Sequence, residues 1–362
     1  MNNPEIITVK NLTKKYPMGL GEFTALNDIS LVFSKGEFSG VVGPSGSGKT
    51  TLLNIISGLV TPTKGRVLYN GVDVTALPPE KRNIAQVFQF PVLYDTMSVY
   101  DNLAFPLRNR HIENKEVDKR VQQVAEILDL TSFLQDRAAG LAADAKQKIS
   151  LGRGLVRSDV AAILFDEPLT VIDPYLKWLL RRKLKEIHEQ LKLTMIYVTH
   201  DQMEALTFAE KVVVMYEGEI VQTGTPEDLF ENPEHRFVGY FIGSPGMNFL
   251  ECRLDGNVAY VNGTGIKLET KTADAAQNAR GKMELGIRPK YLEISSKPVE
   301  NGLEAAVKNL EDLGSYKIVT VMLQNKILHA WLPEDSPVPR GKAWIIFPPQ
   351  KTKLYADGRL VK

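Results

Sequence analysis

The octapeptide GPSGSGKT, from Gly43 to Thr50, constrains the fold of this chain more than any other feature of its sequence. It follows the apolar run FSGVVG and precedes TTLLNIISGL, an order that predicts a strand, a glycine-rich loop and a helix. A loop of the pattern G-x-x-x-x-G-K-[ST] turns its backbone N–H groups around a phosphate chain. Lys49 is expected to reach the β- and γ-phosphates, and the Thr50 hydroxyl to contact magnesium. The expected nucleotide-binding residues of this segment are Gly43, Ser45, Gly46, Ser47, Gly48, Lys49, Thr50 and Thr51.

Two adjacent carboxylates, Asp166 and Glu167, close the apolar run AAILFDEP. Taken alone, they would be read as two solvated acids at a strand end. Beside a phosphate-binding loop, Asp166 is expected to hold magnesium and Glu167 to polarise the water that attacks the γ-phosphate. The sequence therefore predicts ATP and Mg²⁺ as ligands.

The order of the apolar runs predicts an α/β fold over residues 1–240. AAILFDEP and TMIYVTH are continuous apolar runs closed by polar residues, as buried parallel strands are, so we expect a mostly parallel sheet. A helical subdomain is expected over about residues 95–155, inserted between strands of that sheet. In this stretch Val117, Val121, Val124 and Leu128 recur on one helical face.

From residue 241 to residue 362 the pattern changes to short alternating strands. The turn signals Asp255-Gly256-Asn257, Asn262-Gly263 and Asp357-Gly358 separate them. We therefore expect a separate, all-β, barrel-like domain of the OB type.

The composition excludes several classes of protein. Lys+Arg total 44 against 43 Asp+Glu, which leaves no electrostatic basis for binding nucleic acid. Cys252 is the only cysteine, so an intrachain disulfide is excluded. The N-terminus lacks the pattern of a signal peptide, and no run of 18 apolar residues occurs. We expect a soluble cytosolic protein that can dock on a partner embedded in a membrane.

With these motifs the chain resembles the ATP-binding subunits of ABC transporters, closest to the importer type that carries a C-terminal β domain and serves sugars, glycerol phosphates and similar solutes. The resemblance implies a P-loop NTPase core. It places Tyr16 under the adenine, Gln89 on magnesium, Asp173 at the contact between two facing ATP sites, and His200 on the γ-phosphate. Residues 90–97 would help to form the groove in which a membrane subunit docks.

The sequence departs from this family at the signature usually written LSGGQ, which one subunit presents to the ATP of its neighbour. At its positions stand Leu141, Ala142, Ala143, Asp144 and Ala145. The hydroxyl donor is missing, and a carboxylate stands where an anion should dock. At about 4 Å and an effective dielectric of about 20, two unit charges repel by roughly 4 kcal/mol. Alternatively, Asp144 is the N-cap of the following helix and occupies its free N–H groups. Either interpretation predicts a signature that cannot serve a neighbouring ATP in the usual way.

The intact phosphate loop and the altered signature together suggest a heterodimer with a second ATP-binding subunit that contributes its own signature. The pair would drive two membrane-spanning permease subunits, with solute delivered by an extracytoplasmic binding protein. An altered signature of this kind is most similar to that of glycerol importers with two distinct ATPase subunits. Two alternatives stay open, a homodimer that hydrolyses ATP despite the substitutions and a nucleotide-dependent regulatory module with little hydrolysis.

Overall fold

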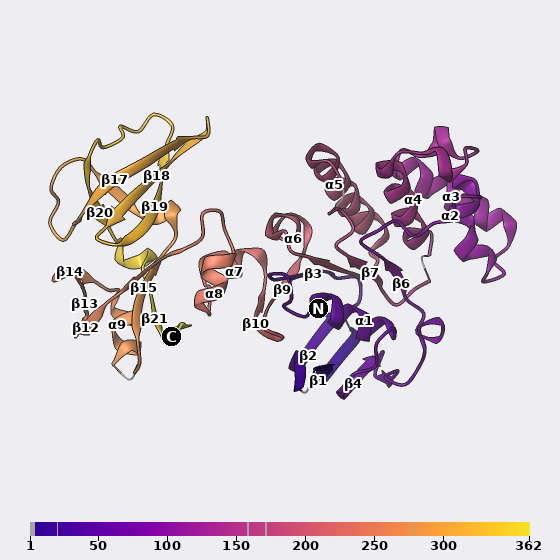
Figure 1. Ribbon diagram of the computed structural model, residues 1–362, viewed down its shortest axis with the longest axis horizontal. Helices are drawn as coiled ribbons and strands as arrows, with labels where there is room; N and C mark the ends of the chain where they lie inside the picture. The colour runs from indigo at the N-terminus through magenta and orange to yellow at the C-terminus, as the bar shows by residue number, and fades with distance from the viewer. Residues whose placement is uncertain (1–3, 20, 158, 171, 278) are drawn as a thin grey trace. The chain divides into compact units, whose positions relative to one another are not determined.

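The computed structural model describes residues 4–19, 21–157, 159–170, 172–277 and 279–362, which form two compact units, Met1–Pro226 and Glu227–Lys362 (Figure 1). The second unit begins earlier than residue 241, where the sequence suggests the boundary, because α7 (Pro226–Glu231) and α8 (Arg236–Phe241) associate with the β domain. Arg288 of that domain holds both helices. Its guanidinium donates to the carbonyl oxygens of Phe230 at 2.9 Å and Gly239 at 2.8 Å.

A six-stranded sheet forms the centre of the first unit, in the order β10-β9-β3-β8-β7-β6. All neighbouring strands run parallel except β9 and β10, which are antiparallel. This topology confirms the predicted α/β core with a mostly parallel sheet. Its strands are β3 (Phe38–Val42), β6 (Ala85–Val87), β7 (Ile163–Asp166), β8 (Met195–Thr199), β9 (Lys211–Tyr216) and β10 (Glu219–Gly224).

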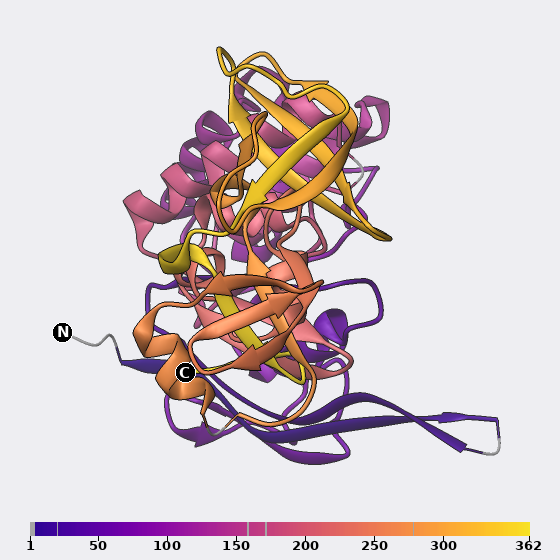
Figure 2. The same ribbon diagram turned by 90° about the vertical axis from the view of Figure 1, so that its left-hand side faces the viewer.

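A second, antiparallel sheet in the same unit has the order β2-β1-β4-β5. Its strands are β1 (Glu5–Met18), β2 (Gly21–Ser34), β4 (Lys64–Tyr69) and β5 (Val72–Asp73). Strands β1 and β2 form a long hairpin, visible as the indigo ribbon in Figure 2, and its register places Tyr16 opposite Phe23.

Helices cover both faces of the parallel sheet (Figure 1). Helix α1 (Lys49–Ser57) packs on the face that carries Val41 and Leu164, in one apolar core with the antiparallel sheet. Helices α5 (Pro174–Leu191) and α6 (Gln202–Phe208) lie on the other face, where the Phe208 ring stacks on Phe38 at 4.7 Å between centroids. These contacts place the start of α1 and the ends of β7 and β8 at the same edge of the sheet.

Helices α2 (Val99–Arg108), α3 (Asn114–Ile127) and α4 (Ala143–Leu155) occupy the stretch between β6 and β7, where the sequence predicts inserted helices. The four residues expected on one helical face, Val117, Val121, Val124 and Leu128, are all buried.

The second unit consists mainly of antiparallel strands, as expected for an all-β domain, together with α7, α8 and α9 (Thr270–Ala276). All three predicted turns connect neighbouring strands, and Asn262-Gly263 and Asp357-Gly358 have positive φ at both residues, as tight hairpins require. Its strands are β11 (Asn248–Glu251), β12 (Arg253–Asp255), β13 (Val258–Val261), β14 (Thr264–Lys267), β15 (Met283–Ile287), β16 (Glu293–Ser295), β17 (Leu303–Asp312), β18 (Tyr316–Leu323), β19 (Lys326–Pro333), β20 (Lys342–Ile346), β21 (Lys353–Ala356) and β22 (Arg359–Leu360).

Among the described residues, no helix combines the length and the apolar character needed to cross a bilayer.

Candidate nucleotide-binding site

The glycine-rich loop ends at Gly48, which precedes the first residue of α1 and has a φ of 98°. A Cβ at Gly48 would lie 2.5 Å from the carbonyl oxygen of Ala25, so no side chain fits there. A Cβ at Gly46 would meet nothing within 4 Å, because this glycine borders open space. No side chain caps α1, and its first turn holds no acidic residue. The N–H groups at this helix end are therefore available to an anionic ligand.

Lys49 is 4% exposed and its ammonium donates to the carbonyl oxygens of Gly43 and Pro44, each at 2.9 Å. Burial lowers the pKa of Lys49, with the charges of Glu167 and Asp166 acting in the opposite direction. A buried ammonium held by loop carbonyls and the Ser47 hydroxyl gains more from a phosphate than an exposed one would, because little water has to be removed from it.

Asp166 ends β7, and its carboxylate accepts a hydrogen bond from the Thr50 hydroxyl at 3.0 Å. Burial raises the pKa of Asp166, and the Thr50 hydrogen bond partly opposes this. A hydroxyl and a buried carboxylate in contact beside a phosphate-binding loop are the oxygen donors that Mg²⁺ prefers, so the residues present fit this ion.

Glu167 has a positive φ of 47°, which turns its side chain away from the direction of β7. Its N–H donates to the carbonyl oxygen of Val198 at 2.9 Å, which fixes this turn against β8. His200 follows β8, and its Nδ1 lies 2.8 Å from Oε2 of Glu167. The structure therefore joins two residues that are far apart in the sequence, at the edge where α1 begins.

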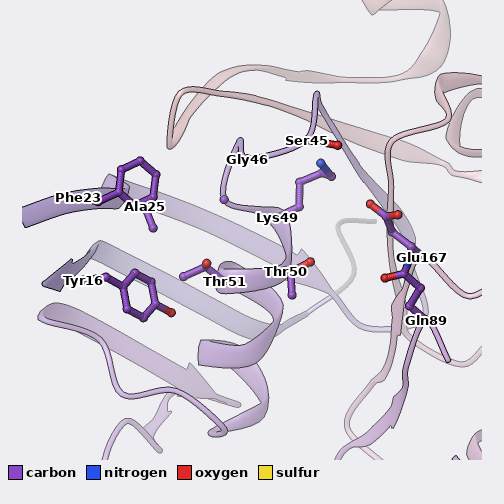
Figure 3. A pocket seen from close by; sticks show the side chains of 11 residues that line it. Tyr16, Phe23, Ala25, Ser45, Gly46, Lys49, Thr50, Thr51, Gln89 and Glu167 are labelled. Atoms are coloured by element: carbon purple, nitrogen blue, oxygen red, sulfur yellow. The ribbon is translucent and has the colours of Figure 1, made fainter. Parts of the chain in front are cut away.

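Lys49, Thr50 and Glu167 line a cavity of about 410 Å³. Figure 3 shows Lys49, Thr50, Gln89 and Glu167 on one side of it and the ring of Tyr16 on the other. The lining comprises Tyr16, Phe23, Ala25, Ser45, Gly46, Gly48, Lys49, Thr50, Thr51, Gln89 and Glu167.

The other predicted residues lie behind or beside the cavity. Ser47 is 2% exposed, and Gly43 packs so tightly that a Cβ there would lie 2.2 Å from the carbonyl oxygen of Met215. Asp166 and His200 are connected to the lining through Thr50 and Glu167 respectively. Asp173 is the N-cap of α5 and accepts a hydrogen bond from the Tyr175 N–H at 2.9 Å. That contact gives Asp173 a local structural role in addition to the one the resemblance implies.

Phe23, like Ala25 two residues later on β2, is a lining residue that sequence analysis missed. It lies opposite Tyr16 in the β1–β2 register, and Figure 3 shows both rings on the same side of the cavity. The ammonium of Lys14 stands over the Tyr16 ring, 4.9 Å from its centroid. The sequence could have indicated Phe23, because in a hairpin one residue of the second strand pairs with Tyr16. Identifying that residue requires the position of the turn, which fixes the register.

Residues 141–145, which the sequence analysis aligns with the family signature, lie at the start of α4, and the structure corrects one interpretation of them. Ala142 is the N-cap, α4 begins at Ala143, and Asp144 is the second helical residue. The N-cap assignment of Asp144 was wrong because the helix already begins one residue earlier, and the Lys146 N–H bonds the carbonyl of the N-cap residue Ala142 at 3.0 Å. Leu141, Ala142 and Ala143 precede or begin the helix, and Ala145 follows within its first turn. No side-chain hydroxyl is therefore available at the N-cap of α4.

The segment 90–97, expected to contribute to a docking groove, exposes three apolar side chains. Phe90 is 67% exposed, Val92 53% and Tyr94 42%. The guanidinium of Arg153 on α4 lies over the Tyr94 ring, 4.9 Å from its centroid. This contact connects the exposed segment to the signature helix.

Comparison with known proteins identifies the family. Residues 26–170 match the ABC transporter family, and residues 243–292 match the MalK OB fold domain. The sn-glycerol-3-phosphate import ATP-binding protein UgpC of Bordetella bronchiseptica is 39% identical over 314 residues, 86% of this chain and 84% of the relative. The trehalose/maltose import ATP-binding protein MalK of Thermococcus litoralis is 40% identical over 316 residues, 83% and 84% of the two chains.

Among solved structures, the ATP-binding cassette MJ0796, a dimer bound to ADP and Pi, matches with a TM-score of 0.55 and 28% identity. The match covers 61% of this chain and 99% of the cassette. These matches agree with the site, where a phosphate-binding loop lies beside two strand-end acids. Together they lead to one assignment. The chain belongs to the ATP-binding subunits of ABC transporters, in the group of importers whose ATPase subunits carry a C-terminal OB-fold domain.

Proposed function

We propose that this chain hydrolyses ATP to power the import of a sugar, glycerol or a related polyol or glycerol phosphate. The relatives named above serve sn-glycerol-3-phosphate and trehalose/maltose import, which supports this class of solute. In this proposal the chain lies at the cytoplasmic face of the membrane, bound to two permease subunits, and an extracytoplasmic protein delivers the solute. The exposed side chains of residues 90–97 supply the surface for one permease subunit.

In this proposal, different residues of the site bind the adenine, the phosphates and Mg²⁺. The rings of Tyr16 and Phe23 form an apolar wall for the adenine. Lys49 and the free N–H groups of the loop hold the phosphates. Thr50, Asp166 and Gln89 would hold Mg²⁺, which supplies neutralisation of the charge that develops on the phosphates.

Glu167 and His200 carry the hydrolytic part of the proposal. The Glu167 carboxylate accepts a proton from the attacking water, and its 2.8 Å contact with Nδ1 of His200 orients both side chains. Nδ1 donates its hydrogen to the Glu167 carboxylate, so Nε2 of His200 donates to a phosphate oxygen only in the protonated, imidazolium form of the ring. A module that only bound nucleotide would need neither group, so this contact argues against the regulatory alternative.

We further propose that the working ATPase is an asymmetric pair, in which a second subunit contributes an intact signature to the ATP bound here. A single observation carries this proposal, namely the start of α4, where Ala142 offers no hydroxyl and Asp144 places a carboxylate in the first turn. An acid in the first turn already interacts favourably with the positive helix end. An ATP on the facing subunit would meet that carboxylate, so α4 of this chain is poorly suited to complete a neighbour's site.

The test compares the ATPase activity of the purified chain alone with that of the chain co-purified with its second subunit. We expect low activity alone and at least about tenfold more in the complex, the factor that 1.4 kcal/mol of lost stabilisation represents. Robust, cooperative turnover by the chain alone would show that it works as a homodimer. Loss of activity in the complex when only the partner's signature serine is replaced would assign the competent signature to the partner.

A further inference from the structure

Glu204 is a buried carboxylate that the proposed hydrolytic mechanism does not use. It lies on α6, five residues after Thr199 at the end of β8, and is 3% exposed. Burial raises its pKa. A carboxyl group in such a position is costly to the fold unless it is fully hydrogen-bonded, so its partners indicate what it stabilises.

Both hydroxyl partners of Glu204 come from β8. The Tyr197 hydroxyl donates to its Oε2 at 3.0 Å, and the Thr199 hydroxyl donates to the same oxygen at 2.8 Å. The Thr199 oxygen in turn accepts the N–H of Asp201 at 3.0 Å. Thr199 and Asp201 are the two chain neighbours of His200, so a single hydroxyl joins the residues on either side of it.

Asp201 is held at its other end as well. Its carboxylate caps α6 by accepting the Met203 N–H at 2.9 Å. The backbone of His200 therefore runs between two anchored residues, while its side chain is 47% exposed and touches only Glu167 among the hydrogen-bond partners described. The position of the ring therefore depends on the backbone that carries it as well as on its contact with Glu167.

We propose that Glu204 is a positioning residue for His200, and that it acts by fixing the Thr199 hydroxyl in the rotamer that holds the N–H of Asp201. Without the carboxylate as acceptor, the Thr199 hydroxyl can rotate, and the turn that carries His200 loses its shared anchor. A displacement of about 1 Å at a reacting group can cost about a hundredfold in rate. The inference rests on the role proposed above for His200.

The test uses three changes in the full chain, assayed in its transporter complex. Glu204→Leu removes the acceptor at similar volume, and Thr199→Val removes the hydroxyl. We expect each to lower kcat by about tenfold or more with the KM for ATP within about twofold, because the phosphate loop is untouched. Glu204→Gln retains an oxygen acceptor for both hydroxyls and should restore most of the activity.

Tyr197→Phe is the matched control. It removes a hydrogen bond to the same Glu204 oxygen, at a site as buried as Thr199, but no hydrogen bond joins Tyr197 to Asp201 among the described residues. We expect it to lower the unfolding temperature as Thr199→Val does while leaving kcat within about twofold. Hydrogen exchange, measured without nucleotide, should accelerate at the Asp201 amide in Glu204→Leu and Thr199→Val and not in Tyr197→Phe.

A combination with His200→Ala separates the possible failures. If Glu204 acts through His200, Glu204→Leu should reduce the residual activity of His200→Ala by no more than about twofold. An equal loss of kcat in Tyr197→Phe, or a full further loss in the His200→Ala background, would overturn the inference and leave the role of His200 standing. Unchanged activity in His200→Ala itself would instead refute the role proposed for His200. Should Glu204→Leu fail to fold, Thr199→Val and the exchange measurement decide the question.

Discussion

Helices α1 and α4 both begin without a side-chain cap, yet they present opposite electrostatic environments to a phosphate. At α1 the N-cap is Gly48 in a left-handed conformation, and the first turn carries no acid. At α4 the N-cap is Ala142 in an extended conformation, and the first turn carries Asp144. Lys49 adds a buried positive charge to the first helix end only.

This difference is the basis of the proposal that the chain binds its own nucleotide and offers little to a neighbour's. A helix N-terminus favours an anion. At α1 this anion would be a bound ligand, and at α4 it is the carboxylate of Asp144. At α1 no side chain of the protein occupies the free N–H groups, so a ligand can bind them. At α4 the protein supplies its own carboxylate, so a phosphate would have to approach a negative charge.

The largest effect is expected from Glu167→Gln, which tests the α1 side of this comparison. Removing the carboxylate that accepts a proton from water should lower ATP turnover by about 10²–10⁴-fold. ATP should remain bound, because the loop and Lys49 are unchanged, and retention of labelled ATP in the complex measures this. Unchanged turnover would remove Glu167 from the proposed mechanism. Glu126→Gln, an equal change of charge on the exposed face of α3, is the control and should have no effect.

Restoring α4 should sharpen the comparison from the other side. The double change Ala142→Ser with Asp144→Gly returns a hydroxyl to the N-cap and removes the carboxylate. We expect the ATPase activity of the chain without a partner subunit to rise by about tenfold or more. Asp144→Asn alone should give part of the gain, since it removes the charge and leaves the hydroxyl missing. No gain in either variant would mean that the α4 end does not limit self-supported activity.

A smaller effect is expected at the base-binding wall. Phe23→Ala should weaken ATP binding by roughly threefold to tenfold, as the loss of one aromatic contact predicts. Binding of inorganic tripolyphosphate, which has no base, should be unchanged in the same titration. Met18→Ala is the matched control, because Met18 is a 70% exposed apolar residue of the same hairpin that does not line the cavity. If ATP and tripolyphosphate lose affinity equally, Phe23 does not contact the base.

The smallest effect concerns stability without nucleotide. Because burial raises the pKa of Asp166 above its value in the unfolded chain, the folded state binds this proton more tightly. Its contribution to stability is therefore present at low pH and is lost as pH rises through the raised pKa. Asp166→Asn should raise the unfolding temperature of the nucleotide-free chain at pH 7 and flatten its dependence on pH between about 4 and 7. Asp173→Asn, at an exposed helix cap that asparagine also fills, should change neither.

Residues whose role depends on their immediate neighbours in the chain were accessible from the sequence. The loop from Gly43 to Thr50, the strand-end acids and the hairpin turns at Asn262-Gly263 and Asp357-Gly358 all depend on local backbone geometry, which a few consecutive residues determine. The same is true of the buried face of α3, whose apolar residues repeat with the period of a helix.

The start of α4 shows where local reasoning stops. An aspartate before a helical pattern is an ordinary N-cap signal, yet the helix begins one residue before it, at Ala143. Alanine has a high helix propensity, so the two alanines before Asp144 gave no signal of where the helix begins. The domain boundary has a similar origin, because α7 and α8 associate with the β domain through Arg288, far along the chain.

By itself, the sequence determined that this chain holds a phosphate-binding loop in an α/β domain, followed by a β domain, and that residues 141–145 carry no hydroxyl side chain. Only the tertiary structure decided that Phe23 stands opposite Tyr16, that His200 touches Glu167, and that Glu204 reaches Thr199. Glycine loops and hairpin turns follow from steric limits on a few dihedral angles. Contacts between strand ends depend on how strands are ordered and paired in the sheet, which no short stretch of residues specifies.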